Sequence, residues 1–166
     1  MKIGVVSDTH VPKRAKALPS ALLKGLQGVD FIIHAGDWQS LEVYERLRRI
    51  APVDGVAGNV DGEEIVRRFG LKKILTFGPY RIGVIHGHGG KRKETAKRAY
   101  ETFAEDRVDI IIFGHSHIPY LKKRRGILLF NPGSPTDKRR QKLYSFGYLE
   151  LQDKIEAKHI FFADRS

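Results

Sequence analysis

The sequence predicts an α/β fold that starts with parallel strands and ends in antiparallel hairpins. Three observations predict it. Short apolar runs, each followed by glycine, aspartate, asparagine or histidine, recur through the first two thirds of the chain. Amphipathic stretches with helical spacing separate several of these runs, and after residue 114 they give way to alternating strand patterns. The 166 residues are a length typical of one domain, and there is no internal repeat or linker, so we expect a single domain over 1–166.

The first part of the chain is expected to hold five strands. Their apolar runs are short and uninterrupted, as is typical of strands that are buried on both faces. The expected strands occupy residues 3–6, 31–33, 53–57, 82–85 and 110–113.

Three helices are expected between these strands. Leucines at helical spacing indicate a helix within 18–26, with Ser20 as the candidate N-cap. A second helix is expected over 40–50, where Ser40 is the N-cap, and a third over 93–105.

The last third of the chain predicts antiparallel hairpins. Alternating patterns indicate four strands, at 119–123, 126–130, 144–151 and 155–162. They add an antiparallel part to the parallel start of the fold.

Composition excludes several classes of protein. Cysteine is absent, which rules out disulfides, a thiolate nucleophile and a cysteine-based zinc site. Lys and Arg number 30 against 19 Asp and Glu, and the resulting net charge of +11 favours an anionic partner. No apolar stretch approaches the ~20 residues that span a bilayer, and Ser7-Asp8 comes too early for a secretory signal. We therefore expect a soluble, cytoplasmic protein that does not bind membranes.

Residue types that bind metals gather where the expected strands end. These segments are Asp8-Thr9-His10, Gly36-Asp37, Gly58-Asn59, His86-Gly87-His88 and Gly114-His115-Ser116-His117. In an open sheet such ends converge on one edge, where ligand sites form. The five segments together predict one shared site.

The spacing of these residues predicts a metal site. Alternate side chains of an extended segment lie on the same side, so Asp8 and His10 can reach one cation, as can His115 and His117. Neutral imidazole, carboxylate and amide groups suit a borderline divalent ion such as Mn, Fe, Ni, Zn or Co. Seven such residues, with one aspartate shared, are enough to hold two ions.

The five segments, in this order, resemble the successive motifs of the calcineurin-like metallophosphoesterases. Asn131-Pro132-Gly133-Ser134, a turn by composition that we expect to brace the site, is similar to a motif of the short YfcE-type phosphodiesterase branch. The resemblance runs from residue 1 to about 150. It implies a four-layer αββα sandwich, in which two sheets are flanked by helices and a dinuclear metal site lies at the C-terminal ends of the strands.

The resemblance also implies roles for individual residues. The first metal ion would be bound by Asp8, His10 and His117, the second by Asn59, His86 and His115, and both by Asp37. Asp37, Asn59 and His88 are the candidate catalytic residues. For His88 two interpretations stay open, in which it contacts either the phosphate or only solvent.

One position departs from the larger members of the family. They carry a histidine directly after the motif asparagine, whereas Asn59 is followed here by Val60. Members of the short branch are similar in lacking that histidine. The pattern also resembles the retromer sorting subunit, a scaffold of the same fold whose site is degraded. All seven expected ligands are present here, which favours an enzyme.

Structural interpretations compete with these roles. Asp8 and Asp37 could cap the helices that follow them, and Asn59 could be a turn residue. His34 lies within an apolar strand and His159 in a terminal strand, so we expect both to be packing or surface residues.

The predicted function is hydrolysis of a phosphate ester, and of a phosphodiester in particular, by a hydroxide that bridges two metal ions. The first alternative is a non-catalytic scaffold that binds another protein. The second is a basic nucleic-acid-binding protein or nuclease, whose affinity would fall steeply with salt. The expected substrates range from small phosphate esters to nucleotides and nucleic acid. The sequence leaves open whether the protein forms a homo-oligomer.

Overall fold

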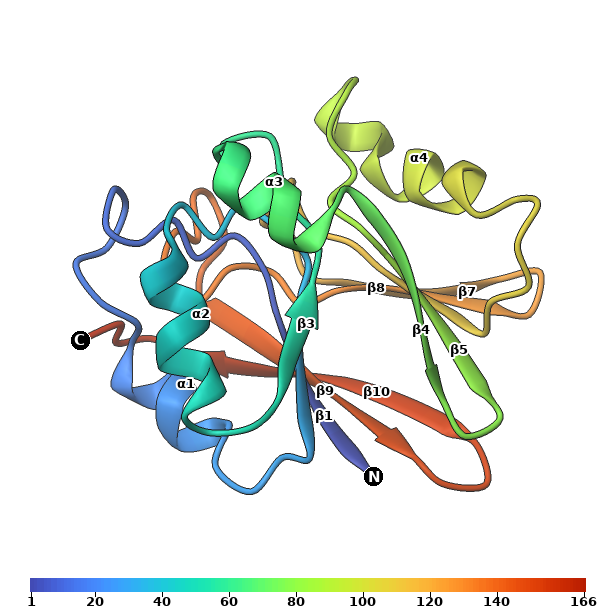
Figure 1. Ribbon diagram of the computed structural model, residues 1–166, viewed down its shortest axis with the longest axis horizontal. Coiled ribbons are helices and arrows are strands. Elements are labelled where there is room, and N and C mark those ends of the chain that lie inside the picture. The colour runs from blue at the N-terminus through green and yellow to red at the C-terminus, as the bar shows by residue number, and fades with distance from the viewer.

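The computed structural model describes residues 1–166 and contains two five-stranded sheets packed face to face (Figure 1). The first sheet has the order β10-β9-β1-β2-β3, and the second has the order β4-β5-β6-β8-β7. The strands of the first sheet are β1 (Lys2–Val6), β2 (Phe31–His34), β3 (Val53–Gly55), β9 (Tyr144–Leu151) and β10 (Ile155–Phe162). Those of the second are β4 (Lys72–Phe77), β5 (Tyr80–Ile85), β6 (Ile110–Ile112), β7 (Tyr120–Arg124) and β8 (Ile127–Asn131).

Both sheets are parallel at the centre and antiparallel at one or both edges. β1, β2 and β3 are parallel to one another, and β9 and β10 extend the sheet as an antiparallel hairpin. In the second sheet β5, β6 and β8 are parallel, while β4 and β7 are antiparallel edge strands. The parallel start and antiparallel end predicted from the sequence are confirmed, and the loops after β1, β2, β3, β5 and β6 carry the five polar segments.

Apolar side chains from both sheets fill the space between them. Ile3 and Val5 of β1 are completely buried and belong to one cluster with Ile82 and Val84 of β5 and with Phe130. Because side chains alternate along a strand, the remaining residues of β1 face outward toward helices.

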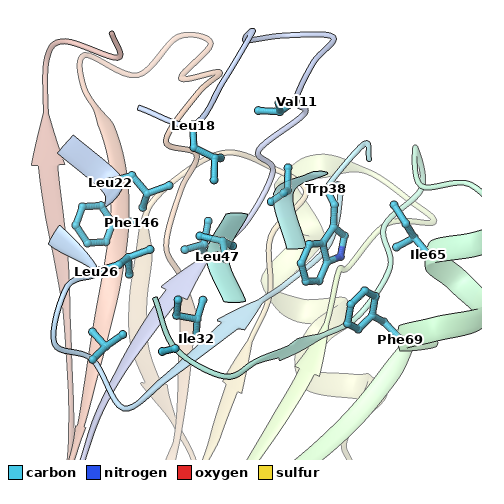
Figure 2. Packing of buried hydrophobic residues seen from close by; sticks show 14 of the residues in the cluster. Val11, Leu18, Leu22, Leu26, Ile32, Trp38, Leu47, Ile65, Phe69 and Phe146 are labelled. Atoms are coloured by element: carbon cyan, nitrogen blue, oxygen red, sulfur yellow. The ribbon is translucent and has the colours of Figure 1, made fainter. Parts of the chain in front are cut away.

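Two helices cover the outer face of the first sheet. These are α1 (Ser20–Gly25) and α2 (Leu41–Arg48). Leu22 and Leu26 pack near Phe146 of β9, and Trp38 stacks on Phe69 with ring centroids 4.5 Å apart (Figure 2). Each fully buried leucine stabilises the fold by roughly 1.5–3 kcal/mol.

The outer face of the second sheet packs against α4 (Thr95–Thr102), which follows the short helix η1 (Arg92–Glu94). Phe103, just after α4, lies against Gly83 of β5. A Cβ atom at Gly83 would come within 2.8 Å of the Phe103 ring, so glycine is required for this close approach. Figure 1 shows α1 and α2 on one side of the two sheets and α4 on the other, and the predicted αββα layers are confirmed.

Some details of the predicted elements are wrong. The N-cap of α1 is Pro19 rather than Ser20, whose hydroxyl instead donates a hydrogen bond to the Ser166 carbonyl. Neither α3 (Glu63–Phe69) nor β4 was predicted from the sequence. β4 is an edge strand without a buried run, so it lacks the continuous apolar pattern that marked the central strands. No helix has the length and hydropathy needed to span a membrane.

Candidate metal centre

The loops at the strand ends turn sharply, and this brings the polar side chains together. Asp8, His10, Asp37, His115 and His117 all adopt left-handed backbone conformations, with φ between 46° and 70°. This conformation costs a residue other than glycine roughly 1–2 kcal/mol, and such backbone strain concentrates at functional sites. The rest of the fold offsets that cost and holds the five residues in place.

The left-handed turns correct one step of the sequence analysis. Asp8 and His10 do converge, but β1 ends at Val6, so they do not lie on an extended segment. His115 and His117 likewise follow the end of β6, and they belong to two different clusters rather than to one. These residues do share a site, as predicted. Left-handed turns, and not the alternation of side chains along a strand, bring them together.

Six side chains form two neighbouring clusters, and within each cluster the candidate ligand atoms lie within 4.8 Å of one another. The first cluster contains Asp8, His10 and His117, and the second contains Asp37, His86 and His115. All six residues are buried. The structure thus brings together six of the seven residues predicted as metal ligands.

The two carboxylates lie between the clusters. Asp37 Oδ2 is 3.0 Å from His86 Nε2 and 3.6 Å from His10 Nε2, so it reaches one imidazole of each cluster. Asp8 Oδ1 is 3.4 Å from His117 Nε2 and 3.7 Å from His86 Nε2. A shared carboxylate is the arrangement expected of a dinuclear site.

Four buried polar atoms at this point have no hydrogen-bond partner. They are Asp8 Oδ1 and the Nε2 atoms of His10, His86 and His117. A buried polar atom without a partner costs about 1–3 kcal/mol, and four in one place require an explanation. Divalent cations would satisfy all of them, because carboxylate oxygen and imidazole nitrogen are the donor atoms such ions prefer.

Backbone carbonyls fix the orientation of two of the histidines. His86 Nδ1 lies 2.8 Å from the Ala35 carbonyl, and His117 Nδ1 lies 2.5 Å from the Asp137 carbonyl. Because a carbonyl only accepts, each Nδ1 carries the hydrogen and each neutral ring presents the Nε2 lone pair to the site. Metal-binding histidines are commonly held in this way.

The charges of the site are strongly coupled. Burial opposes the charged form of His86, but Asp8 and Asp37 outweigh it and raise the pKa of His86 to about 9. Burial also opposes ionisation of Asp8, yet the charges of His117 and His86 hold its pKa well below the ordinary value. Burial, together with the charge of His86, lowers the pKa of His115 to about 4. The two carboxylates therefore favour positive charge at this position.

The turn at Asn131–Ser134 braces the site, as predicted. Ser134 donates its hydroxyl hydrogen to the Asp8 carbonyl at 2.8 Å, and the Asn131 amide donates to the Gly114 carbonyl at 3.0 Å. Gly133 has φ of 77°, which glycine adopts without strain.

Neither Asp8 nor Asp37 caps a helix, since the helices that follow begin after Pro19 and Ser40.

Asp61, which is not among the predicted site residues, holds the loop after β2. Its carboxylate accepts hydrogen bonds from the backbone N–H groups of Asp37, Trp38, Gln39 and Gly58. Burial raises the pKa of Asp61. Its position two residues after Asn59 was the only signal in the sequence.

His34 is a buried packing residue, as predicted. Its ring stacks on Trp38 with centroids 3.9 Å apart. Nδ1 accepts the Gly36 N–H, so Nε2 carries the hydrogen and donates it to the Thr9 hydroxyl. His34 thereby connects the loop that carries Asp8 to the loop that carries Asp37.

Comparison with known proteins identifies the family. The calcineurin-like phosphoesterase superfamily domain matches residues 1–154. The chain belongs to this superfamily. The family predicted from the sequence is confirmed.

Relatives of this chain carry names that match the family. A probable metallophosphoesterase of Methanocaldococcus jannaschii is 41% identical over 160 residues, covering 96% of this chain and 81% of the relative. A protein of the same organism named as a phosphodiesterase is 29% identical over 147 residues, covering 80% and 83% of the two chains. These names agree with the predicted function of a metal-dependent phosphoesterase.

Solved structures share the fold of this chain. Vps29 of Entamoeba histolytica, solved in complex with zinc, aligns with a TM-score of 0.77 and 26% identity, covering 97% of this chain and 99% of that one. The similarity to Vps29 bears on the scaffold alternative, and the names of the relatives bear on the phosphoesterase function. The scaffold alternative is not the better supported of the two.

The remaining predicted site residues lie at the rim of the site. Asn59 and Val60 are exposed in the turn after β3, where the Val60 N–H donates to Asp37 Oδ1 at 3.0 Å. His88 is exposed, with its ring centroid 5.6 Å from that of His86 and 6.4 Å from that of His115. Both side chains are thus exposed at the rim, with His88 beside His86 and His115 and with Asn59 in the turn that contacts Asp37.

Proposed function

We propose that the protein is a phosphodiesterase that uses two divalent metal ions. The first would be held by Asp8, His10 and His117, the second by Asn59, His86 and His115, and both by Asp37. The observation that carries the proposal is the set of four buried, unpartnered atoms that face one another between the two clusters.

The charge of the site supports an anionic substrate. Asp8 and Asp37 contribute two negative charges, whereas two divalent ions contribute four positive ones. A loaded site is therefore net positive and attracts the phosphate group. The two ions would polarise the phosphoryl oxygens and lower the pKa of water to supply a nucleophile.

The residues of the chain position the reaction. Asp37 fixes the distance between the two halves of the site, because it contacts an imidazole in each cluster. The carbonyls of Ala35 and Asp137 keep His86 and His117 in the tautomer that offers Nε2. His88 would donate a hydrogen bond to a substrate phosphate, a role supported by its exposed position next to His86 and His115. No serine or cysteine nucleophile is needed.

Metal analysis and activity measurements test the proposal together. We expect purified protein to bind about two ions per chain and to hydrolyse bis(4-nitrophenyl) phosphate once Mn, Fe, Ni, Zn or Co is present. EDTA should abolish hydrolysis, and restoring the ion should recover it. Undiminished hydrolysis in metal-free protein would contradict the metal mechanism. Full metal content with no turnover of any phosphate ester would favour the scaffold.

A further inference from the structure

A basic groove begins at the candidate metal centre. It encloses about 380 Å³ between the start of η1 and the segment after Thr136. Five cationic residues line it, namely Arg92, Lys93, Lys138, Arg139 and Arg140. Ser116, which also lines the groove, is the residue between His115 and His117. The groove therefore lies beside the loop that carries His115 and His117.

A second basic groove continues from the first. It encloses about 370 Å³ between α4 and β7, and its cationic residues are Lys93, Lys97, Lys122, Lys123 and Arg124. Lys93 belongs to both grooves, so they form one track that leads away from the centre. We call these two grooves the basic track.

The cations of the basic track are largely without carboxylate partners. No acidic residue lines either groove. Of the nine cations, only Arg139 forms an ion pair, with Asp137 at 3.8 Å. Elsewhere on the protein, Lys72 and Lys73 each pair with an aspartate at 2.9 Å or less. Unpaired cations concentrated along one path favour a ligand with repeated negative charges.

Apolar groups lie among these cations. The Ile118 side chain is 47% exposed in the first groove, and the ring of Tyr120 lines the second. Lys122 Nζ lies 5.5 Å from the centroid of the Tyr120 ring. A row of cations with apolar and aromatic side chains beside it is how proteins bind single-stranded nucleic acid, because unpaired bases pack on such side chains.

We propose that the substrate is a single-stranded nucleic acid that lies along the basic track with one phosphodiester in the metal centre. This rests on the proposed function, since hydrolysis of that diester is the reaction assigned to the centre. Water adds to the phosphorus atom, one P–O ester bond breaks, and the leaving oxygen takes up a proton. The two products are shorter strands, one of which keeps the phosphate.

Binding is tested without metal, so that it does not depend on catalysis. The probe is a fluorescent 12-nucleotide single strand, and its anisotropy is measured in EDTA over a range of salt concentrations. Two triple variants remove the same amount of charge, K122Q/K123Q/R124Q from the basic track and K24Q/R46Q/R49Q from exposed positions on α1, on α2 and directly after α2. We expect the track variant to bind about tenfold more weakly or worse, with a smaller dependence on salt, and the control variant to bind within about twofold of the wild type. Equal losses in the two variants would overturn the proposal, because net charge alone would then explain binding.

Competition distinguishes nucleic acid from other polyanions. Inorganic polyphosphate carries the charge but has no bases, so the unlabelled strand should displace the probe at several-fold lower phosphate concentration. Ile118→Ser should reduce that difference. Polyphosphate that competes as well as the strand, at equal phosphate, would contradict a nucleic-acid substrate.

Hydrolysis separates this proposal from the proposed function. With metal added, the ratio of strand cleavage to hydrolysis of bis(4-nitrophenyl) phosphate should fall about tenfold in the track variant and stay constant in the control. Hydrolysis of the small diester with no cleavage of the strand would overturn the nucleic-acid substrate and leave the phosphodiesterase intact. Failure to hydrolyse either diester would refute the proposed function, while the binding comparison would still report on the track.

Discussion

The backbone N–H of His115 donates a hydrogen bond to Asp8 Oδ2 at 3.0 Å and so connects the loop after β6 to the loop after β1. The same oxygen accepts the Ser7 hydroxyl at 2.8 Å, which leaves Oδ1 as the unpartnered atom that faces the site. One carboxylate therefore does two things, because Oδ2 joins the two sheets and Oδ1 is available to a cation.

Two substitutions of Asp8 separate these roles. Asp8→Asn keeps an acceptor for His115 but loses the charge, so we expect a large loss of metal and activity. Asp8→Ala also leaves the Ser7 hydroxyl and the His115 N–H without their acceptor, and it should be less stable than Asp8→Asn by about 1–3 kcal/mol. Chemical denaturation in EDTA measures that difference. Equal stability of the two variants would show that the bond between the loops contributes nothing.

Asp37 and Asn59 are predicted to differ in their effect on metal content. Asp37 reaches an imidazole in both clusters, whereas Asn59 is exposed at the rim. Asp37→Ala should lose both ions and more activity, and Asn59→Ala should lose at most the second ion. Metal analysis after dialysis, with kcat measured at saturating metal, checks this. Equal metal content and equal losses of activity in the two variants would show that Asp37 does not bridge the two ions.

The sequence predicted the members of the site better than their geometry. Apolar runs identified the central strands, and the parallel order of β1, β2 and β3 placed Asp8 and Asp37 at one edge. The left-handed turns were not predictable, because Asp and His adopt that conformation only where surrounding contacts impose it. For Asp8 those contacts come from Ser134 and His115, which are more than a hundred residues away.

The basic track also could not be predicted from the sequence. Its lysines and arginines are scattered through residues 92–140, and their spacing in the sequence does not show which of them lie side by side. Their alignment depends on α4 packing against the second sheet beside β7. A net charge of +11 indicated an anionic partner, but only the fold shows where these charges gather.

His34 should make stability depend on pH. Burial lowers the pKa of His34 to about 3, whereas an unfolded histidine titrates near 6.5. Between these values only the unfolded chain binds the proton, so the contribution of His34 is complete above pH 6.5 and is lost as the pH falls. From pH 7 to 5, the free energy of unfolding of the wild type in EDTA should fall by about 1–2 kcal/mol more than that of His34→Gln. The same pH dependence in the wild type and in His34→Gln would mean that His34 is already protonated in the folded protein. Its Nδ1 could then no longer accept the hydrogen bond from the Gly36 N–H.

The last prediction concerns the leaving group. A general acid typically contributes about 10²–10⁴-fold to the rate, and Val60, which follows Asn59, has no proton to donate. The leaving oxygen must therefore depart with substantial negative charge unless His88 supplies a hydrogen bond. Among small diesters that do not reach the basic track, rates should fall steeply as the pKa of the leaving group rises, so that aryl diesters react fast and alkyl diesters slowly.

Val60→His tests this directly. The Val60 side chain is 39% exposed at the rim of the site, and only its backbone N–H bonds to Asp37, so the substitution leaves that bond in place. A histidine here should accelerate poor leaving groups more than good ones and flatten the dependence on leaving-group pKa, while Val60→Gln, which is polar but not an acid, should keep the wild-type slope. A series of diesters with graded leaving groups measures the three slopes. A shallow wild-type slope that steepens in His88→Gln would identify His88 as the acid already in place, whereas a slope that stays shallow in every variant would show that a step other than P–O cleavage limits the rate.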